Sequence, residues 1–216
     1  MIGAVMVTGG ATQFHYAAFV DGGPVSGTVS LPSGIKGNAD GVVVYLKGVT
    51  NDGSAAGKVQ SKEIEQINST FSPNFSVVVK NTTVKFPNKD KIFHNVFSLS
   101  RPARFDLGLY AAGEGKEVKF RRPGLVEIFC NIHPDMVANV LVVEDKNFAV
   151  ADASGKFNIS NVPPGSYEIH AYHPSKGKFE GTVVVAPGGT TSDIALSKVQ
   201  KKKHARKDGT PYGRYK

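Results

Sequence analysis

The sequence predicts an all-β protein built from small β-sandwiches. Short segments rich in Val, Ile, Phe and Tyr recur along the chain, and clusters of Gly, Pro, Asn and Asp separate them. We find no convincing apolar repeat of helical period over ten residues or more. Hydrophobic residues make up 40% of the 216 residues, and no segment approaches the roughly 18 consecutive apolar residues of a spanning helix. We therefore expect a globular protein that is soluble or at most peripheral to a membrane.

The outer parts of the chain predict one sandwich made from two segments. Residues 24–62 offer only two strands, at 25–31 and 41–49, and two strands are marginal in water. Residues 146–197 offer strands at 148–151, 156–159, 167–173, 179–185 and 190–196. Together these segments supply six or seven strands, which favours a discontinuous domain. The alternative is two consecutive domains with an irregular N-terminal arm.

The middle of the chain, residues 63–145, predicts a second sandwich. Its expected strands are 75–79, 82–86, 93–99, 117–120, 125–130 and 138–143. This spacing of short strands is typical of a sandwich. Three further segments complete the predicted organisation: an N-terminal arm at 1–23, a polar loop or linker at 51–62 and a basic tail at 198–216. The start of the chain shows no clear signal peptide, because no basic residue precedes the short apolar stretch.

One motif in the middle segment carries recognisable chemistry. Cys130, His133 and Met136 form a C-x2-H-x2-M pattern between two expected strands, and Cys130 is the sole cysteine. His94 lies 36 residues upstream, near the start of another expected strand. Two imidazoles, one thiolate and a weak thioether are the ligands of a blue-copper site. Alternatives are a buried structural Cys with an ordinary loop His and core Met, or a Cys–His nucleophile. A structural zinc site would need more firm ligands.

The motif and its flanks resemble the cupredoxin family. The 130–136 loop is similar to the ligand loop of amicyanin and plastocyanin, and Phe86-Pro87-Asn88 with His94-Asn95-Val96 resembles the segment that carries the first histidine of that family. The resemblance implies a Greek-key sandwich at 63–145 and one type 1 copper bound by His94, Cys130, His133 and Met136. It also implies that Asn95 ties the His-bearing loop to the Cys loop, and that His133 and Pro134 form an electron-transfer surface.

The outer segments resemble a different family. The stretches 151–157 and 162–167 (ADASGKF and VPPGSY) are similar to carboxypeptidase regulatory-like, transthyretin-like sandwiches. The combination with a cupredoxin resembles bacterial exported proteins labelled plastocyanin-like or methylamine-utilisation-like. This resemblance implies a periplasmic or extracellular location and favours insertion of the copper domain into the outer sandwich.

These features predict a one-electron carrier rather than an enzyme, because four ligands leave no open position for a substrate. Its redox partner would be a cytochrome or a dehydrogenase. The alternatives are a copper storage or delivery protein, and a structural sandwich with a vestigial site. Absence of an intense visible absorption with Cu(II) would indicate the vestigial site. Reversible reduction with the metal retained would support the carrier, and ready loss of Cu(I) to a chelator would support delivery.

The net charge of +8 is concentrated in the tail. Residues 198–216 contain eight basic residues and one acid, which gives +7 and leaves the rest of the chain near neutral. A basic end of this kind is usually solvated, and it could dock to an acidic partner, an anionic membrane surface or an assembly neighbour. Nucleic acid is disfavoured as a partner because the body of the protein carries almost no net charge.

Overall fold

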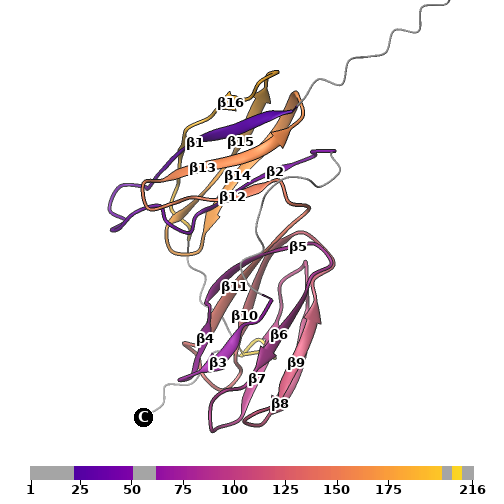
Figure 1. The fold of residues 1–216 in the computed structure, drawn as a ribbon. Helices are drawn as coiled ribbons and strands as arrows, with labels where there is room; N and C mark the ends of the chain where they lie inside the picture. Colours follow the sequence, from indigo (N-terminus) through magenta and orange to yellow (C-terminus); the bar gives the residue numbers. More distant parts are fainter. Residues whose placement is uncertain (1–21, 51–61, 201–205, 211–216) are drawn as a thin grey trace, which may run out of the picture.

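The computed structural model describes residues 22–50, 62–200 and 206–210, and these residues form strands and loops with no helix. The predicted N-terminal arm, apart from its last two residues, and nearly all of the 51–62 loop lie outside the described residues. Figure 1 shows two stacked bodies of strands, one formed by β1, β2 and β12 onward and the other by β3 to β11. Within the described part of the chain, no helix is long and apolar enough to cross a membrane.

The first body, which we call the outer sandwich, contains two sheets. One sheet comprises β13 (Lys156–Val162), β1 (Gly23–Ser30), β16 (Thr190–Thr191) and β17 (Ile194–Ala195). The other comprises β12 (Phe148–Val150), β2 (Val43–Lys47), β14 (Gly165–His173) and β15 (Gly177–Val185). Val25 and Val44 share one buried core with Ile159 and Ile169, so side chains from both ends of the chain fill this sandwich.

The second body, which we call the middle sandwich, is built around a five-stranded sheet. Its order is β5 (Phe75–Val79), β11 (Val137–Val143), β10 (Gly124–Phe129), β7 (His94–Ser98) and β8 (Phe105–Tyr110). Two smaller sheets pair β6 (Thr83–Pro87) with β9 (Gly115–Lys119), and β3 (Glu65–Ile67) with β4 (Thr70–Ser72). Phe86, Phe120 and Ile128 are fully buried in the core of this sandwich, together with Cys130 and Met136.

The all-β prediction is confirmed, and the strand predictions differ from the structure in two respects: three strands were not expected, and one expected strand is divided. β3, β4 and β8 were not expected, because two of them are only three residues long and the third, FDLGLY, mixes polar and apolar residues with a glycine. The strand expected at 190–196 is instead two short pieces, β16 and β17, that each pair in parallel with β1. The limits of the two domains stay a prediction.

A third apolar cluster joins the two sandwiches. In β11, Val140 and Val142 face the middle core, whereas Leu141 and Val143 pack with Val43 and Phe148 of the outer sandwich. Successive side chains of a strand point to opposite faces, so a strand that is apolar on both faces can fill two cores at once. The apolar runs of β2, β5 and β11 therefore serve the contact between the sandwiches as well as their interiors.

His173, at the end of β14, lies beside this contact. Its ring meets Phe75 edge-on with 5.1 Å between the ring centres, and its Nδ1 accepts the Ser175 N–H at 3.3 Å. Burial lowers the pKa of His173 from 6.5 to about 4, and the nearby Lys176 adds to this, whereas Asp40 opposes it. The folded protein therefore holds His173 neutral at neutral pH.

Acid is expected to destabilise the folded protein through His173. The pKa of His173 is lower in the folded state than in the unfolded chain, so below pH 6.5 the unfolded chain binds a proton that the folded protein does not. The free energy of unfolding is therefore unaffected by His173 above pH 6.5 and decreases as the pH falls toward 4. At 1.36 kcal/mol for each unit of pKa difference the loss has an upper bound of about 3 kcal/mol, and solvent screening at the partly exposed ring makes it smaller. Chemical unfolding at pH 7 and pH 4.5 measures it, with His173→Gln as the comparison. An equally steep pH dependence in His173→Gln would assign the effect to other groups.

Candidate metal centre

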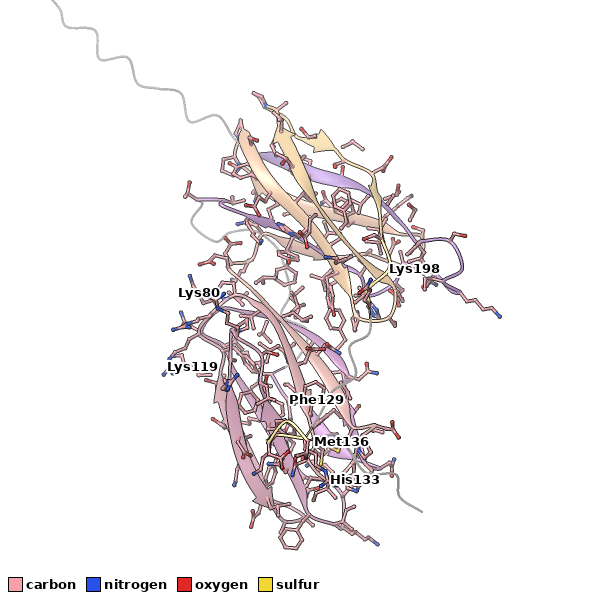
Figure 2. The ribbon with its side chains drawn as sticks, turned by 180° about the vertical axis from the view of Figure 1, so that it is seen from behind. Lys80, Lys119, Phe129, His133, Met136 and Lys198 are labelled. Carbon is pink, nitrogen blue, oxygen red and sulfur yellow. The ribbon has the colours of Figure 1, made fainter. Side chains whose placement is uncertain are left out.

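Two neighbouring strands of the middle sandwich bring the sequence motif together. His94 is the first residue of β7, and Cys130 directly follows β10, which pairs antiparallel with β7 through Phe129 and Phe97. The end of β10 therefore lies close to the beginning of β7. The 130–136 loop then leads into β11, and Figure 2 shows His133 and Met136 on this loop in the middle sandwich.

Three donor atoms converge at this point. The Sγ of Cys130 lies 3.9 Å from His94 Nδ1 and 3.7 Å from His133 Nδ1, and all three donor atoms lie within 4.8 Å of one another. The two imidazole rings stand 4.9 Å apart between centres at an interplanar angle of 62°. His94 and Cys130 are fully buried, and His133 is partly exposed. The three side chains thus form one compact group with a single accessible edge.

The donor spacing fits one metal ion. A metal that binds a thiolate at about 2.3 Å and an imidazole at about 2.05 Å in a trigonal plane separates the two donor atoms by about 3.8 Å. The observed distances of 3.9 and 3.7 Å match this value. A soft thiolate together with two imidazoles is the donor set that suits copper in a blue-copper site.

Met136 closes the 130–136 loop through its main chain. Its N–H donates to the His133 carbonyl at 3.1 Å, and its carbonyl accepts the Cys130 N–H at 3.2 Å. The side chain is fully buried in the same core as Cys130. The structure therefore places all four sequence-predicted ligands around one loop and one strand end, with a donor-to-donor geometry that is defined for the three His and Cys side chains.

Asp90 fixes the orientation of His94 and was not among the site residues predicted from the sequence. Its Oδ2 lies 2.7 Å from His94 Nε2. With a carboxylate at Nε2, that nitrogen carries the proton, and Nδ1 presents its lone pair toward Cys130. A metal-binding histidine commonly donates its other N–H to a carboxylate in this way. The signal available in the sequence was the position of Asp90, four residues before His94 and just after a Pro-Asn turn.

The turn between β3 and β4 holds Asp90 in place. Asn68 and Ser69 both have φ of 52°, and their N–H groups donate to the two carboxylate oxygens at 2.6 and 2.8 Å. Two successive residues of positive φ make a type I′ turn, in which adjacent N–H groups can converge on an anion. Burial opposes the ionisation of Asp90, but the hydrogen bonds from Ser69, His94 and Asn68 hold its pKa below the ordinary value. The carboxylate therefore stays charged beside His94.

Asn95 makes a different connection from the one the resemblance implies. Its Nδ2 donates to Asp106 Oδ1 at 2.7 Å and to the Gly108 carbonyl at 3.1 Å, so the side chain binds β8 rather than the Cys130 loop. β8 was not among the expected strands, and its bulge against β7 between Asn95 and Phe97 brings Asp106 within reach. Asn95 is thus adjacent to the site and supports the strand that begins with His94.

His133 forms the accessible edge of the group. It lies in a shallow depression lined by Ser69, Ile132, Pro134 and Asp135. Burial lowers the pKa of His133 and the neighbouring His94 lowers it further, whereas Asp90 opposes the shift. An imidazole must be neutral to bind a metal, so this environment favours the binding form at neutral pH. Ile132 and Pro134 give this depression an apolar rim. Val137 lines a neighbouring groove between the two sandwiches, which Pro134 and Asp135 also line.

Comparisons with known proteins give partial likenesses. Residues 146–193 match the family described as polysaccharide lyase family 4, domain II. No curated protein matches the chain. The family match covers part of the outer sandwich under a different description from the transthyretin-like one, so the transthyretin-like assignment stays a prediction.

Solved structures similar to this chain include copper proteins. A purple cupredoxin from Nitrosopumilus maritimus is 24% identical, with 38% of this chain and 98% of that chain covered and a TM-score of 0.35. A Cu(I) form of an amicyanin variant is 15% identical, with 46% and 98% covered and a TM-score of 0.36. A copper-containing nitrite reductase from Thermus scotoductus is 23% identical, with 44% of this chain and 25% of that chain covered and a TM-score of 0.37. Scores this low do not assign the chain to a family.

Proposed function

We propose that this protein binds one copper ion as a type 1 centre and carries single electrons between redox proteins. The observation that carries the proposal is the convergence of His94 Nδ1, Cys130 Sγ and His133 Nδ1 at distances that suit one metal ion. Met136 would complete the set as a weak axial ligand. Copper bound there supplies reversible one-electron chemistry.

The residues around the site favour electron transfer over catalysis. Cys130 and His94 are fully buried, so the donor group is closed on the side of the core. His133 is the ligand with a partly exposed ring, and Pro134 and Ile132 flank it. A partner that docks over this depression would come within contact of a ligand without displacing it. We propose a cytochrome or dehydrogenase as partner and a periplasmic or extracellular location.

The orientation of His94 supports a carrier over a protein that releases copper. The two main-chain N–H groups that bind Asp90, and Asp90 at His94 Nε2, hold the imidazole in one position. A site held in one geometry changes little between the oxidised and reduced states, which favours fast electron transfer. A delivery protein would instead need to open around Cu(I).

Reconstitution of the full chain with Cu(II) tests the proposal. We expect an intense visible absorption from thiolate-to-copper charge transfer, absent in Cys130→Ala, and reversible reduction with the metal retained. A colourless protein with Cu(II) bound elsewhere would overturn the type 1 site and favour a structural sandwich with a vestigial motif. A coloured protein that surrenders Cu(I) readily to a chelator would favour storage or delivery.

Replacement of Met136 by leucine is expected to raise the reduction potential. Leucine nearly conserves the volume of the fully buried side chain but cannot donate a sulfur lone pair, so the oxidised state of the metal loses stabilisation. A redox titration of the copper-loaded variant beside the wild type measures the change. If colour and potential are both unchanged, Met136 is not the axial ligand.

A further inference from the structure

The described part of the basic tail, residues 206–210, folds into a tight turn. The Arg206 N–H donates to the Thr210 carbonyl, and the Gly209 N–H donates to the Arg206 carbonyl, both at 2.8 Å. Gly209 has φ of 85°, a conformation that glycine adopts without strain, and Asp208 Oδ1 accepts the Thr210 N–H at 2.9 Å. The Asp-Gly pair therefore shapes this turn locally.

This turn lies on the middle sandwich and not on the outer sandwich that precedes it in the chain. Figures 1 and 2 show it as a short yellow segment over the lower body, next to the loop that carries His133 and Met136. The contacts are made by Lys207. Its main-chain N–H donates to Asn131 Oδ1 at 3.1 Å, and its Nζ pairs with Asp106 Oδ2 at 2.8 Å.

Each of the two residues that Lys207 contacts is connected to a proposed ligand. Asn131 follows Cys130 in the ligand loop. Asp106 accepts the Asn95 amide through its other oxygen, and Asn95 follows His94 at the beginning of β7. Lys207 therefore connects the residues that come immediately after two of the proposed ligands, although it is 76 residues from Asn131 and 101 residues from Asp106.

We infer that residues 206–210 form a clasp, with Lys207 as a positioning residue that holds the 130–136 loop against β7 and β8. This inference rests on the proposed function, because the loop carries three of the four copper ligands. The clasp assigns part of the tail charge to the protein's own copper domain. It would restrict the loop to conformations in which Cys130 and His133 lie beside His94.

The ion pair should act on the loop more than on global stability. The side chains of Lys207 and Asp106 are 44% and 40% exposed, and exposed ion pairs contribute little to the free energy of unfolding. The Lys207 contacts, in contrast, join the loop at Asn131 directly to Asp106 of β8, so their loss should change how often the loop opens. A local measurement therefore separates positioning from general stabilisation.

Amide hydrogen exchange of the metal-free full chain tests the clasp. We expect residues 131–136 to exchange about two- to fivefold faster in Lys207→Met, as an exposed ion pair allows. A chain ending at residue 205, which also loses the Asn131 contact, should exchange about tenfold faster. Lys207→Arg should restore the wild-type rate. Lys119→Met, at an exposed lysine of β9 (Figure 2), is the control and should leave this loop unchanged.

Salt and copper give two independent readouts. High salt should bring the wild-type exchange rate toward that of Lys207→Met and leave the variant unaffected, because salt screens exposed charges. In the copper-loaded protein, the thiolate-to-copper band should shift or broaden in the shortened chain and in Lys207→Met, but not in Lys207→Arg.

The outcomes distinguish the clasp from the copper site. Equal exchange of the 131–136 amides in wild type, Lys207→Met and the shortened chain overturns the clasp. Faster exchange with an unchanged copper band in both variants overturns its role in positioning the ligands. If no form of the protein, wild type included, gives a copper band, the proposed function fails, while the exchange rates still decide whether the clasp holds the loop.

Discussion

Replacing Asp90 with alanine is expected to weaken copper binding by about 10- to 100-fold, the usual cost of removing a group that orients a ligand. Asp90 lies 2.7 Å from His94 Nε2 and is held by the N–H groups of Asn68 and Ser69. Without the carboxylate, His94 loses the partner that keeps Nδ1 directed at Cys130. Competition with a chelator of known affinity, for both copper oxidation states, measures the loss.

A matched control separates ligand orientation from charge. Asp135 is an exposed acid beside His133, so Asp135→Ala removes one negative charge near the same site while leaving His94 and its carboxylate untouched. We expect Asp135→Ala to bind copper nearly as the wild type does. Asp90→Asn keeps an acceptor for the ring N–H and should fall between wild type and Asp90→Ala. Equal losses in Asp90→Ala and Asp135→Ala would show that Asp90 acts only through its charge.

Replacing Phe148 with alanine is expected to lower the free energy of unfolding by about 3–5 kcal/mol, the range for a large aromatic side chain removed from a core. Phe148 is 2% exposed and belongs to the apolar cluster that joins the two sandwiches, with Val77, Leu141 and Val143 of the middle sandwich. The cavity would lie between the sandwiches, so the substitution should also uncouple their unfolding.

Chemical unfolding monitored by circular dichroism measures this effect. We expect one cooperative transition in the wild type, and an earlier, broader or split transition in Phe148→Ala. The control is Val184→Ala on β15, where the side chain is 69% exposed and the change in free energy should stay within about 0.5 kcal/mol. A loss in Phe148→Ala no larger than that of the control would mean that this cluster does not couple the two sandwiches.

The sequence alone was sufficient for the class of fold and for the identity of the four proposed ligands. Alternating or wholly apolar runs bounded by turn residues predict strands because the side-chain period of a strand is a local property. The C-x2-H-x2-M loop is local as well, and His94 stands out as an imidazole at the start of an expected strand upstream. The expected strands 75–79 and 138–143 correspond closely to β5 and β11.

The tertiary structure alone determines which groups contact and orient the site residues. Asp90 reaches His94 only because the β3–β4 turn, 21 to 22 residues upstream of Asp90, supplies two N–H groups to its carboxylate. Asn95 reaches Asp106 only through a bulge between β7 and β8. These contacts join short elements with weak sequence signals, and a turn residue alone does not indicate which distant group it will bind.

Long-range contacts also decided which surfaces the apolar strands and the basic tail pack against. The sequence by itself determined that β2, β5 and β11 are apolar on both faces and that the final residues are basic. It could not determine that one face of each strand packs against the other sandwich, or that Lys207 lies against Asp106 and Asn131. Side-chain periodicity and charge indicate which surfaces need a partner. Long-range packing selects the partner itself.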